Sequence, residues 1–330
     1  KTAYEMLRSL VGSEMCIRDR YGGVGIGIYE ISHRNILRRI SLYEVTINNI
    51  ISPLVGLQRN VTGNIISDSI FNFSNASILQ LYNQTTSGVG NNTFSNLQLI
   101  NATKHALHAD TGFVINNTFR NITITGTGMS AINLTNARDI DLINITFYNT
   151  PWNVYAYNAS IRNYSMQNFS LKWENGSGSI AFINTSLNAS GPNLSQVIKF
   201  ANNSVFVNST LDTGFNTTAN ITLFNVNFTT PNVLVAYDDL TFTDCSSPQC
   251  NILSYTAGNL TFNVSRFTTY RGAEGNSACT RYCYNCTNCT EEIALASPGE
   301  RICLSANILN AAGNCLNFSG KDNFVFSCRG

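Results

Sequence analysis

Residues able to do acid–base or ion chemistry gather at two places in the chain. The first group is Lys104, His105, His108 and Asp110, and the second is Asp139 and Asp141. Carboxylate clusters together with a basic residue, often with calcium, are one arrangement by which enzymes cleave polysaccharides. Asp139 and Asp141 stand two apart, so on a strand they share one face. They would hold an ion only with further oxygens, and such histidines are more often surface strand residues or histidines whose hydrogen bonds are satisfied within the fold.

Aromatic residues form a third candidate group. Trp152 and Tyr155, with Tyr157 and Trp173 nearby, could stack on sugar rings in a groove, although core or loop packing is the commoner role of such residues. Asp238-Asp239 resembles the paired aspartates of polygalacturonases but lacks their accompanying His-Gly. No carboxylate pair lines up on neighbouring repeats. The sequence therefore favours a non-enzyme, and we assign no catalytic residue, metal ligand or cofactor.

The elements that position these residues are set by a repeated phrase, Asn-x-Thr/Ser-apolar-x-Asn. Its clearest copies span residues 91–96, 116–121, 144–149 and 163–168. The Thr/Ser positions, extended by looser copies, are 46, 69, 93, 118, 146, 165 and 186, with steps of 23, 24, 25, 28, 19 and 21. Such a period predicts a solenoid, in which each repeat buries its apolar face against its neighbours. Coils aligned on Phe119 and Phe147 place His108 near Asn133.

Each copy of the phrase lies in a strand-like alternation of apolar and polar residues. Coils of roughly 20–25 residues with two or three short strands are typical of a parallel β-helix. The Thr suits a strand exterior, the next apolar residue points inward, and the closing Asn tolerates the left-handed backbone of a corner. Stacked Asn side chains can then hydrogen-bond as a ladder. Residues 43–190 accordingly resemble the right-handed parallel β-helix family.

The composition limits the classes of partner. Asn accounts for 46 of 330 residues, charged residues make up only 12%, and the net charge is +1. A neutral chain of this kind argues against nucleic-acid binding as the main role. No run of eighteen apolar residues is present, so no membrane span is expected in this sequence.

Residues 1–20 are set apart from the fold. The run from Leu10 to Arg20 resembles an in-frame translation of a sequencing adapter, a recurrent artefact of assembled environmental DNA. The alternative is a short genuine helix over 4–10. We therefore expect residues 1–20 to lie outside the native fold. We also expect a parallel β-helix over 21–195 and expect both native ends to be missing.

The phrase thins after about Leu171, while strand-like alternation continues between turn-rich stretches. We expect a small β-sandwich-like segment over 196–270, in which Cys245 and Cys250 close one loop. A Cys-rich linker over 271–296 follows. Residues 297–330 resemble the truncated start of a second β-helix in the NosD/pectate-lyase-like group, with Pro298-Gly299 leading to a first strand. The Cys-rich joint and restart look like large surface proteins of small uncultured archaea.

The cysteines admit three interpretations. The spacing Cys279-x3-Cys283-x2-Cys286 is that of a radical-SAM cluster loop, but Asn285 stands where an aromatic residue is usual. Four closely spaced cysteines also suit zinc. Disulfides are favoured because the other features point outside the cell. The candidates are Cys245, Cys250, Cys279, Cys283, Cys286, Cys289, Cys303, Cys315 and Cys328, and spacing alone does not give their pairing.

The sequence contains more than twenty Asn-x-Ser/Thr sequons. Seven glycosylation candidates are Asn60, Asn75, Asn101, Asn133, Asn158, Asn208 and Asn220. A fold rich in Asn corners and Thr strands also generates sequons by composition alone. Taken together, the sequence predicts an extracellular, N-glycosylated structural or adhesive solenoid contacting surface glycans or other cell-surface proteins. The alternative is a carbohydrate-active enzyme or sugar-binding protein of the same fold.

Overall fold

The computed structural model describes residues 15–17, 25–29, 32–45, 53–82, 88–110, 113–237, 241–275, 279, 281–297, 300–305, 308, 315–318, 320–321 and 325–327. These fall into two compact units. The first comprises Lys1–Val226 and Val233–Gly272, and the second Asn227–Asn232 and Ala273–Gly330.

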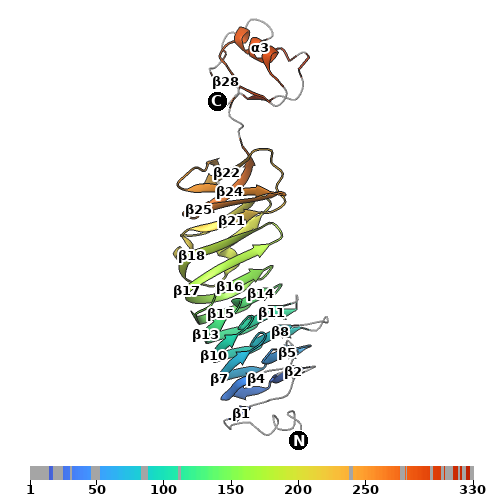
Figure 1. Cartoon of the computed structure of the whole chain (residues 1–330), viewed down its shortest axis with the longest axis vertical. Helices are drawn as coiled ribbons and strands as arrows, with labels where there is room; N and C mark the ends of the chain where they lie inside the picture. The colour runs from blue at the N-terminus through green and yellow to red at the C-terminus, as the bar shows by residue number, and fades with distance from the viewer. Residues whose placement is uncertain are drawn as a thin grey trace. The chain divides into compact units, whose positions relative to one another are not determined.

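Successive coils of the first unit lie over one another as parallel strands, which confirms the predicted parallel β-solenoid (Figure 1). One side of the coils is formed by β2 (Ile26–Tyr29), β5 (Val55–Gln58), β8 (Leu79–Tyr82), β11 (Leu107–Asp110), β14 (Ser130–Thr135) and β16 (Trp152–Tyr157). Two further sides are formed by β3 (Ile36–Arg38) with β4 (Ile40–Val45), then β7 (Ile65–Ser74), β10 (Thr93–Ala102), β13 (Thr118–Thr127) and β15 (Ile140–Tyr148). Short strands β6 (Val61–Thr62), β9 (Val89–Gly90) and β12 (Val114–Ile115) complete the coils, and β1 (Met15–Ile17) pairs in parallel with β4.

The long strands bend at left-handed residues placed five apart. In one coil these corners are Asn91, Asn96 and Asn101, and in the next they are Asn116, Asn121 and Gly126, all with φ between 53° and 67°. Asn and Gly adopt this conformation at least cost. The prediction that the closing Asn of the phrase turns a corner is confirmed at Asn96, Asn121, Asn149 and Asn168. The first Asn of the phrase also turns a corner at Asn91, Asn116 and Asn144.

Each corner resets the alternation of inward and outward residues. After corner Asn91, Asn92 and Phe94 point inward, and after corner Asn96, Leu97 and Leu99 do so; all four are buried. The inward residues stack coil on coil. The rings of Phe94 and Phe119, for example, are parallel within 6° with centroids 4.8 Å apart, which matches the spacing of adjacent strands.

The buried side chains of Asn64, Asn92 and Asn117 form an internal ladder. Asn64 Nδ2 donates to Asn92 Oδ1 (2.9 Å), and Asn92 Nδ2 donates to Asn117 Oδ1 (3.0 Å). The same oxygens accept the backbone N–H groups of Asn64 and Asn92. Because buried polar groups must be paired, the ladder fixes the register of these coils.

The alignment of repeats assigned from the sequence is correct between Thr93 and Thr118 and wrong for the steps from Ser69 to Thr93 and from Thr118 to Thr146. Thr93 pairs with Ile65, not Ser69, and Thr118 pairs with Asp141, not Thr146. Phe119 therefore stacks over Leu142, while Phe147 pairs with Ile124 on the neighbouring side of the coil. The reason is the five-residue spacing of the corners, which lets the phrase fit two adjacent sides equally well.

An antiparallel extension follows the last coils. Strand β17 (Ile161–Asn175) pairs in parallel with β15 and β16 and antiparallel with β18 (Gly178–Gly191). The sheet then continues through β21 (Ala219–Leu223), β25 (Asn259–Val264) and β24 (Cys250–Thr256), all antiparallel. Parallel stacking thus ends where β17 folds back on β18.

A second antiparallel sheet provides the sandwich-like element expected over 196–270. Its strands are β19 (Ile198–Ala201), β20 (Ser204–Val207), β26 (Thr269–Glu274), β22 (Pro231–Ala236) and β23 (Thr243–Asp244), with α2 (Leu194–Val197) and the 3-10 turn η1 (Thr213–Phe215) beside them. Phe182 and Phe262 of the first sheet contact Phe267 (centroids 5.3 Å) and Tyr270 (6.1 Å), respectively. The boundaries proposed at 195/196 and 270/271 stay predictions.

The second unit contains β27 (Arg281–Cys283), α3 (Cys286–Leu295), β28 (Arg301–Leu304) and β29 (Val325–Ser327). Its three strands run parallel in the order β27-β28-β29. Its small core consists of Cys283, Cys289, Ile293, Ala296 and Ile302. The Pro298-Gly299 turn lies outside the described residues.

None of the helices described above is both long and apolar enough to cross a lipid bilayer.

Candidate functional site

The side of the solenoid built from β8, β11, β14 and β16 holds part of the predicted ligand group. His108 lies between Gln80 and Asn133, and Asn133 lies beside Tyr155 on the next coil. The placement of His108 near Asn133 is confirmed. Asp110 pairs with Tyr82 in a neighbouring column. Because these side chains are half-buried, this surface exposes ring edges and hydroxyl groups and does not form a deep cavity.

The side chain of His105 has a structural role. Its Nδ1 lies 2.9 Å from the carbonyl oxygen of Ser130, and its Nε2 lies 3.2 Å from Asn133 Nδ2. Nδ1–H donation and Nε2 acceptance satisfy both nitrogens in the neutral ring. Burial lowers the pKa of His105 and also that of His108, whose ring centroid is 5.1 Å away. His105, in the turn before β11, is thus a buried histidine whose hydrogen-bonding groups are satisfied, which is one of the two roles that the sequence left open.

Lys104, Trp152 and Tyr155 complete this side of the coil. Lys104 is exposed at the turn before β11, and Trp152 pairs with Ser130. Lys172 Nζ lies 5.3 Å from the centroid of the Tyr155 ring and 2.8 Å from Glu174. The Tyr155 ring face is therefore already occupied by a cation, which limits its use as a stacking platform for sugars.

Asp139 and Asp141 lie on a different side of the coil from His108, so the structure does not unite the two predicted groups. Asp139 is an exposed left-handed corner, whereas Asp141 is buried, so the expectation that they share a strand face is wrong. The left-handed corner breaks the alternation on which that expectation rested. Ser160 Oγ accepts the backbone N–H of Asp139 (2.8 Å).

Asp141 is the acceptor in a structural cluster. Arg162 donates to its two oxygens from Nε (2.9 Å) and Nη2 (2.6 Å), Asn163 Nδ2 donates at 2.8 Å, and Thr118 Oγ1 donates at 3.0 Å. Burial alone would raise the pKa of Asp141, but these hydrogen bonds outweigh burial and lower it. A carboxylate with four donors is a structural anchor and leaves little capacity for a ligand.

A polar hollow that sequence reasoning missed lies where the last coils meet α2 and β19. It measures about 580 Å³ and is lined by Arg138, Lys199, Trp173, Phe200, Ile198, Ala159, Ser195 and the carboxamides of Asn136, Asn158 and Asn175. The lining brings together two cations and three carboxamides without a carboxylate. Its members come from strands far apart in sequence, so only the tertiary structure could reveal it.

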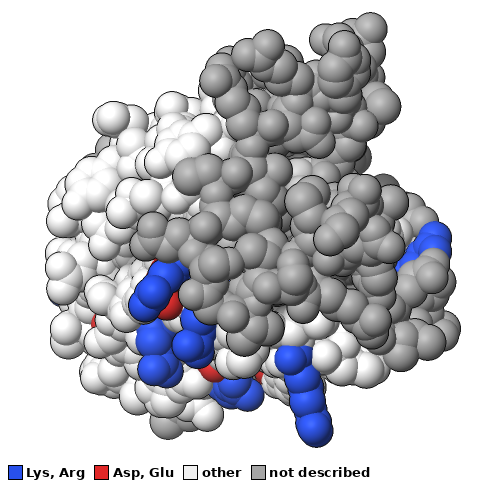
Figure 2. All heavy atoms as spheres, turned by 90° about the horizontal axis from the view of Figure 1, so that it is seen from below, with Lys and Arg blue, Asp and Glu red and all other residues white. Residues whose placement is uncertain are grey.

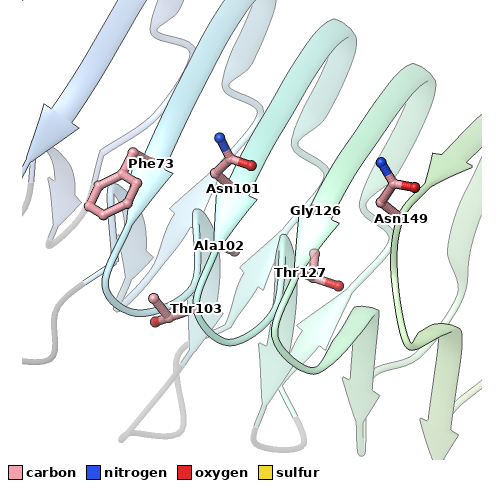
Figure 3. A pocket seen from close by; sticks show the side chains of 7 residues that line it. All are labelled: Phe73, Asn101, Ala102, Thr103, Gly126, Thr127 and Asn149. Carbon is pink, nitrogen blue, oxygen red and sulfur yellow. The ribbon is translucent and has the colours of Figure 1, made fainter.

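A second hollow follows one row of corners on the outside of the coils (Figure 3). It measures about 360 Å³ and is lined by Phe73, Asn101, Ala102, Thr103, Gly126, Thr127 and Asn149. Phe73, Asn101, Gly126 and Asn149 are left-handed corners of four successive coils. The hollow lies where glycine interrupts a row of side chains.

Figure 2 shows several Lys and Arg side chains close together on the face that it draws, with a few acidic side chains among them. Arg34, Arg38 and Arg39 of the first coils are exposed. Hydrogen bonds from Asn96 and Ser67 lower the pKa of Asp68, and the charges of Arg38 and Arg39 lower it further. Net charge alone could not indicate this local asymmetry.

The predicted glycosylation sites differ in accessibility. Asn101 and Asn158 are exposed corners with left-handed backbone, whereas Asn60, Asn75, Asn133, Asn208 and Asn220 are half-buried. An N-linked sugar needs an exposed amide. Exposure therefore favours the first two among the seven candidates.

Four disulfides pair eight of the nine candidate cysteines. They join Cys245–Cys250, Cys279–Cys303, Cys283–Cys289 and Cys286–Cys315. The predicted loop closure by Cys245 and Cys250 is confirmed. The four closely spaced cysteines are divided among three bridges, so they do not act together as a zinc or cluster ligand set. Cys328 lies outside the described residues, as does the Asp238-Asp239 pair.

Within the described part of the chain, no three His, Cys, Asp or Glu side chains converge in a way that could hold a metal ion. Comparison with known protein families, with curated proteins and with solved structures found no match to this chain. The class of protein is accordingly defined by the fold itself: a disulfide-containing parallel β-solenoid.

Proposed function

We propose that this chain is an extracellular structural or adhesive module of a cell surface, carrying N-linked glycans and contacting surface glycans or other cell-surface proteins. The observation that carries the proposal is the combination of coil-to-coil asparagine ladders with four disulfides. Disulfides persist in oxidising compartments, outside the cytosol. A solenoid extends coil by coil and presents long lateral faces for contacts.

The use of the polar groups supports a scaffold. Asp141 is held by Arg162, Glu174 by Lys172, and the buried Asp212 accepts from Tyr164 Oη (2.9 Å). Carboxylates held in this way stabilise the solenoid and are poorly placed to act as acid and base. The earlier resemblance of the Cys-rich segment to surface proteins of uncultured archaea points to the same role.

Secretion of the full chain behind a leader peptide tests this proposal. We expect secreted protein with eight thiols oxidised in the bridges above, resistance of the solenoid to protease, and binding of cells or of immobilised surface glycans. Protein that accumulates only under reducing conditions, with all these thiols free, would refute an extracellular role. Retention of oxidised protein without any cell or glycan binding would refute the adhesive part.

The hollow beside Arg138 and Lys199 favours a second candidate function, a sugar-binding protein for acidic saccharides. Two cations with three carboxamides match a carboxylate- or sulfate-bearing sugar, since cations pair with the acid and amides bind hydroxyls. Its volume of about 580 Å³ lies in the range of ligand sites. A polysaccharide lyase or hydrolase of this fold is the enzymatic form of this alternative.

Titration calorimetry with polygalacturonate fragments and with neutral glucan fragments tests this candidate. We expect binding of the acidic fragment alone, and at least a tenfold loss in the double variant Arg138→Ala/Lys199→Ala. Lys104→Ala removes an exposed cation outside the hollow and serves as the matched control. Equal binding of acidic and neutral fragments, or an equal loss in the control, would rule out this site. New reducing ends or unsaturated products would indicate the enzyme.

A further inference from the structure

Asn101 occupies an unusual place in its row of corners. It is exposed, has φ 58°, and begins the sequon Asn101-Ala102-Thr103. On one side along the solenoid lies Phe73, and on the other lies Gly126, which has no side chain (Figure 3). The hollow of about 360 Å³ opens around this asparagine.

Asn121 provides a matched comparison in the adjacent row of corners. It is also exposed, has φ 53°, and begins the sequon Asn121-Ile122-Thr123. Asn121 Nδ2 donates to Asn96 Oδ1 (3.0 Å), and Asn121 Oδ1 accepts from Asn144 Nδ2 (2.9 Å). Asparagines therefore fill both neighbouring positions. By contrast, the one ladder bond of Asn101, from Nδ2 to Asn72 Oδ1, is long at 3.4 Å.

The stereochemistry of an N-linked sugar separates the two sites. The linkage makes the side-chain amide secondary, and secondary amides prefer the trans form, which places the substituent on the same side as the carbonyl oxygen. At Asn121 that side is taken by the amide of Asn144. At Asn101 the side of the carbonyl oxygen faces residue 126. A Cβ added to Gly126 would lie only 2.7 Å from Asn101 Oδ1. Glycine at 126 is what leaves room.

Phe73 borders the hollow on the side of Asn101 opposite to Gly126. It is a left-handed aromatic corner, 40% exposed, and its ring lines the hollow beside Asn101. The trans amide directs the first sugar toward Gly126 and away from this ring.

We propose that Asn101 is the corner at which this fold accommodates an N-linked glycan, with the first sugar over Gly126, and that Asn121 is not. The inference rests on the proposed extracellular function. In the transfer step Nδ2 of Asn101 bonds to the anomeric carbon of a lipid-pyrophosphate-linked oligosaccharide. The bond from that carbon to the pyrophosphate oxygen breaks, and Nδ2 loses one proton. A chain modified in this way can pack into the native structure only where the fold leaves room for the attached sugar.

The test is site-resolved glycan occupancy of the full chain secreted from a eukaryotic host, measured by enzymatic deglycosylation in ¹⁸O-water and peptide mass spectrometry. We expect occupancy at Asn101 at least fivefold higher than at Asn121. Gly126→Asn keeps a residue tolerant of the left-handed corner, creates no new sequon, and should lower occupancy at Asn101 severalfold. Asn144→Gly removes the neighbour of Asn121 and should raise occupancy there.

Several outcomes would overturn the inference: equal or greater occupancy at Asn121, an unchanged Asn101 in the Gly126→Asn protein, or an unchanged Asn121 in the Asn144→Gly protein. If Gly126→Asn is not secreted, the Asn144→Gly comparison decides alone. Occupied sequons elsewhere with a bare Asn101 would refute this inference and leave the proposed function standing. Secreted protein without any glycan would refute the inference and the glycosylated part of the proposed function together.

Discussion

The side-chain amide of Asn92 is shared between two coils: its oxygen accepts from Asn64 Nδ2 at 2.9 Å, and its nitrogen donates to Asn117 Oδ1 at 3.0 Å. All three asparagines are buried. The row ends at Ile140, which follows the corner Asp139 as Asn117 follows Asn116. Because the apolar side chain of Ile140 needs no hydrogen-bond partner, the ladder ends without an unpaired amide.

Asn92→Ala should destabilise the first unit by about 3 kcal/mol, because the backbone N–H of Asn64 and the Asn117 amide lose buried partners. Asn121→Gly is the matched control, since it removes an exposed ladder residue and keeps the left-handed corner; its cost should stay below about 1 kcal/mol. Urea unfolding followed by circular dichroism measures both. Similar midpoints for the two variants would contradict a special role for the internal ladder.

Phe119→Ala should cost about 3–5 kcal/mol, because its fully buried ring stacks on Phe94. Phe147→Ala should cost less than about 2 kcal/mol, because Phe147 is only half-buried and lies beside Ile124. Thermal unfolding of the two variants compares them directly. Equal losses would mean that Phe147 belongs to the Phe94 stack, as the sequence alignment of coils had it.

The pair of Asp141 and Arg162 should make stability depend on acid pH. The pKa of Asp141 is lowered in the native state, so its contribution is fully present above the ordinary aspartate pKa of about 4 and is lost as pH falls below that toward the native pKa. Asp141→Asn should flatten the pH dependence in this window. Arg162 is half exposed, so solvent screening keeps the effect modest. Unfolding curves between pH 2 and 6 test this, and an unchanged slope in the variant would exclude Asp141 as the source.

Reduction should unfold the second unit before the first. Two of its five core residues, Cys283 and Cys289, are bonded to each other, and its remaining core is small. Units of this size depend on cross-links worth about 2–4 kcal/mol each. Limited proteolysis with and without reductant, mapped by mass spectrometry, should show cleavage confined to 273–330. Protection of that segment after full reduction, verified by thiol counting, would show that packing alone holds it.

Local chemistry made the solenoid readable from the sequence. Asn tolerates a left-handed backbone in any context, and the alternation of apolar and polar residues around Phe94 and Phe119 is typical of any strand. Both features can therefore be recognised without knowing the neighbouring coils. The role of Asn92 was less accessible, because Asn91 and Asn92 are identical in type. Only their positions at the corner and just after it make the first exposed and the second buried.

The sequence by itself determined that chain segments stack in parallel with amides at the bends and that cysteines collect near the C-terminal end. Tertiary structure decided the phase, because corners five residues apart allow Thr146 to be aligned with Thr118 when its partner is Thr123. It also decided that Arg138 meets Lys199 at one hollow and that Gly126 lies over Asn101. Such relationships depend on how many residues each coil has between its corners, and that number is fixed only when the coils pack.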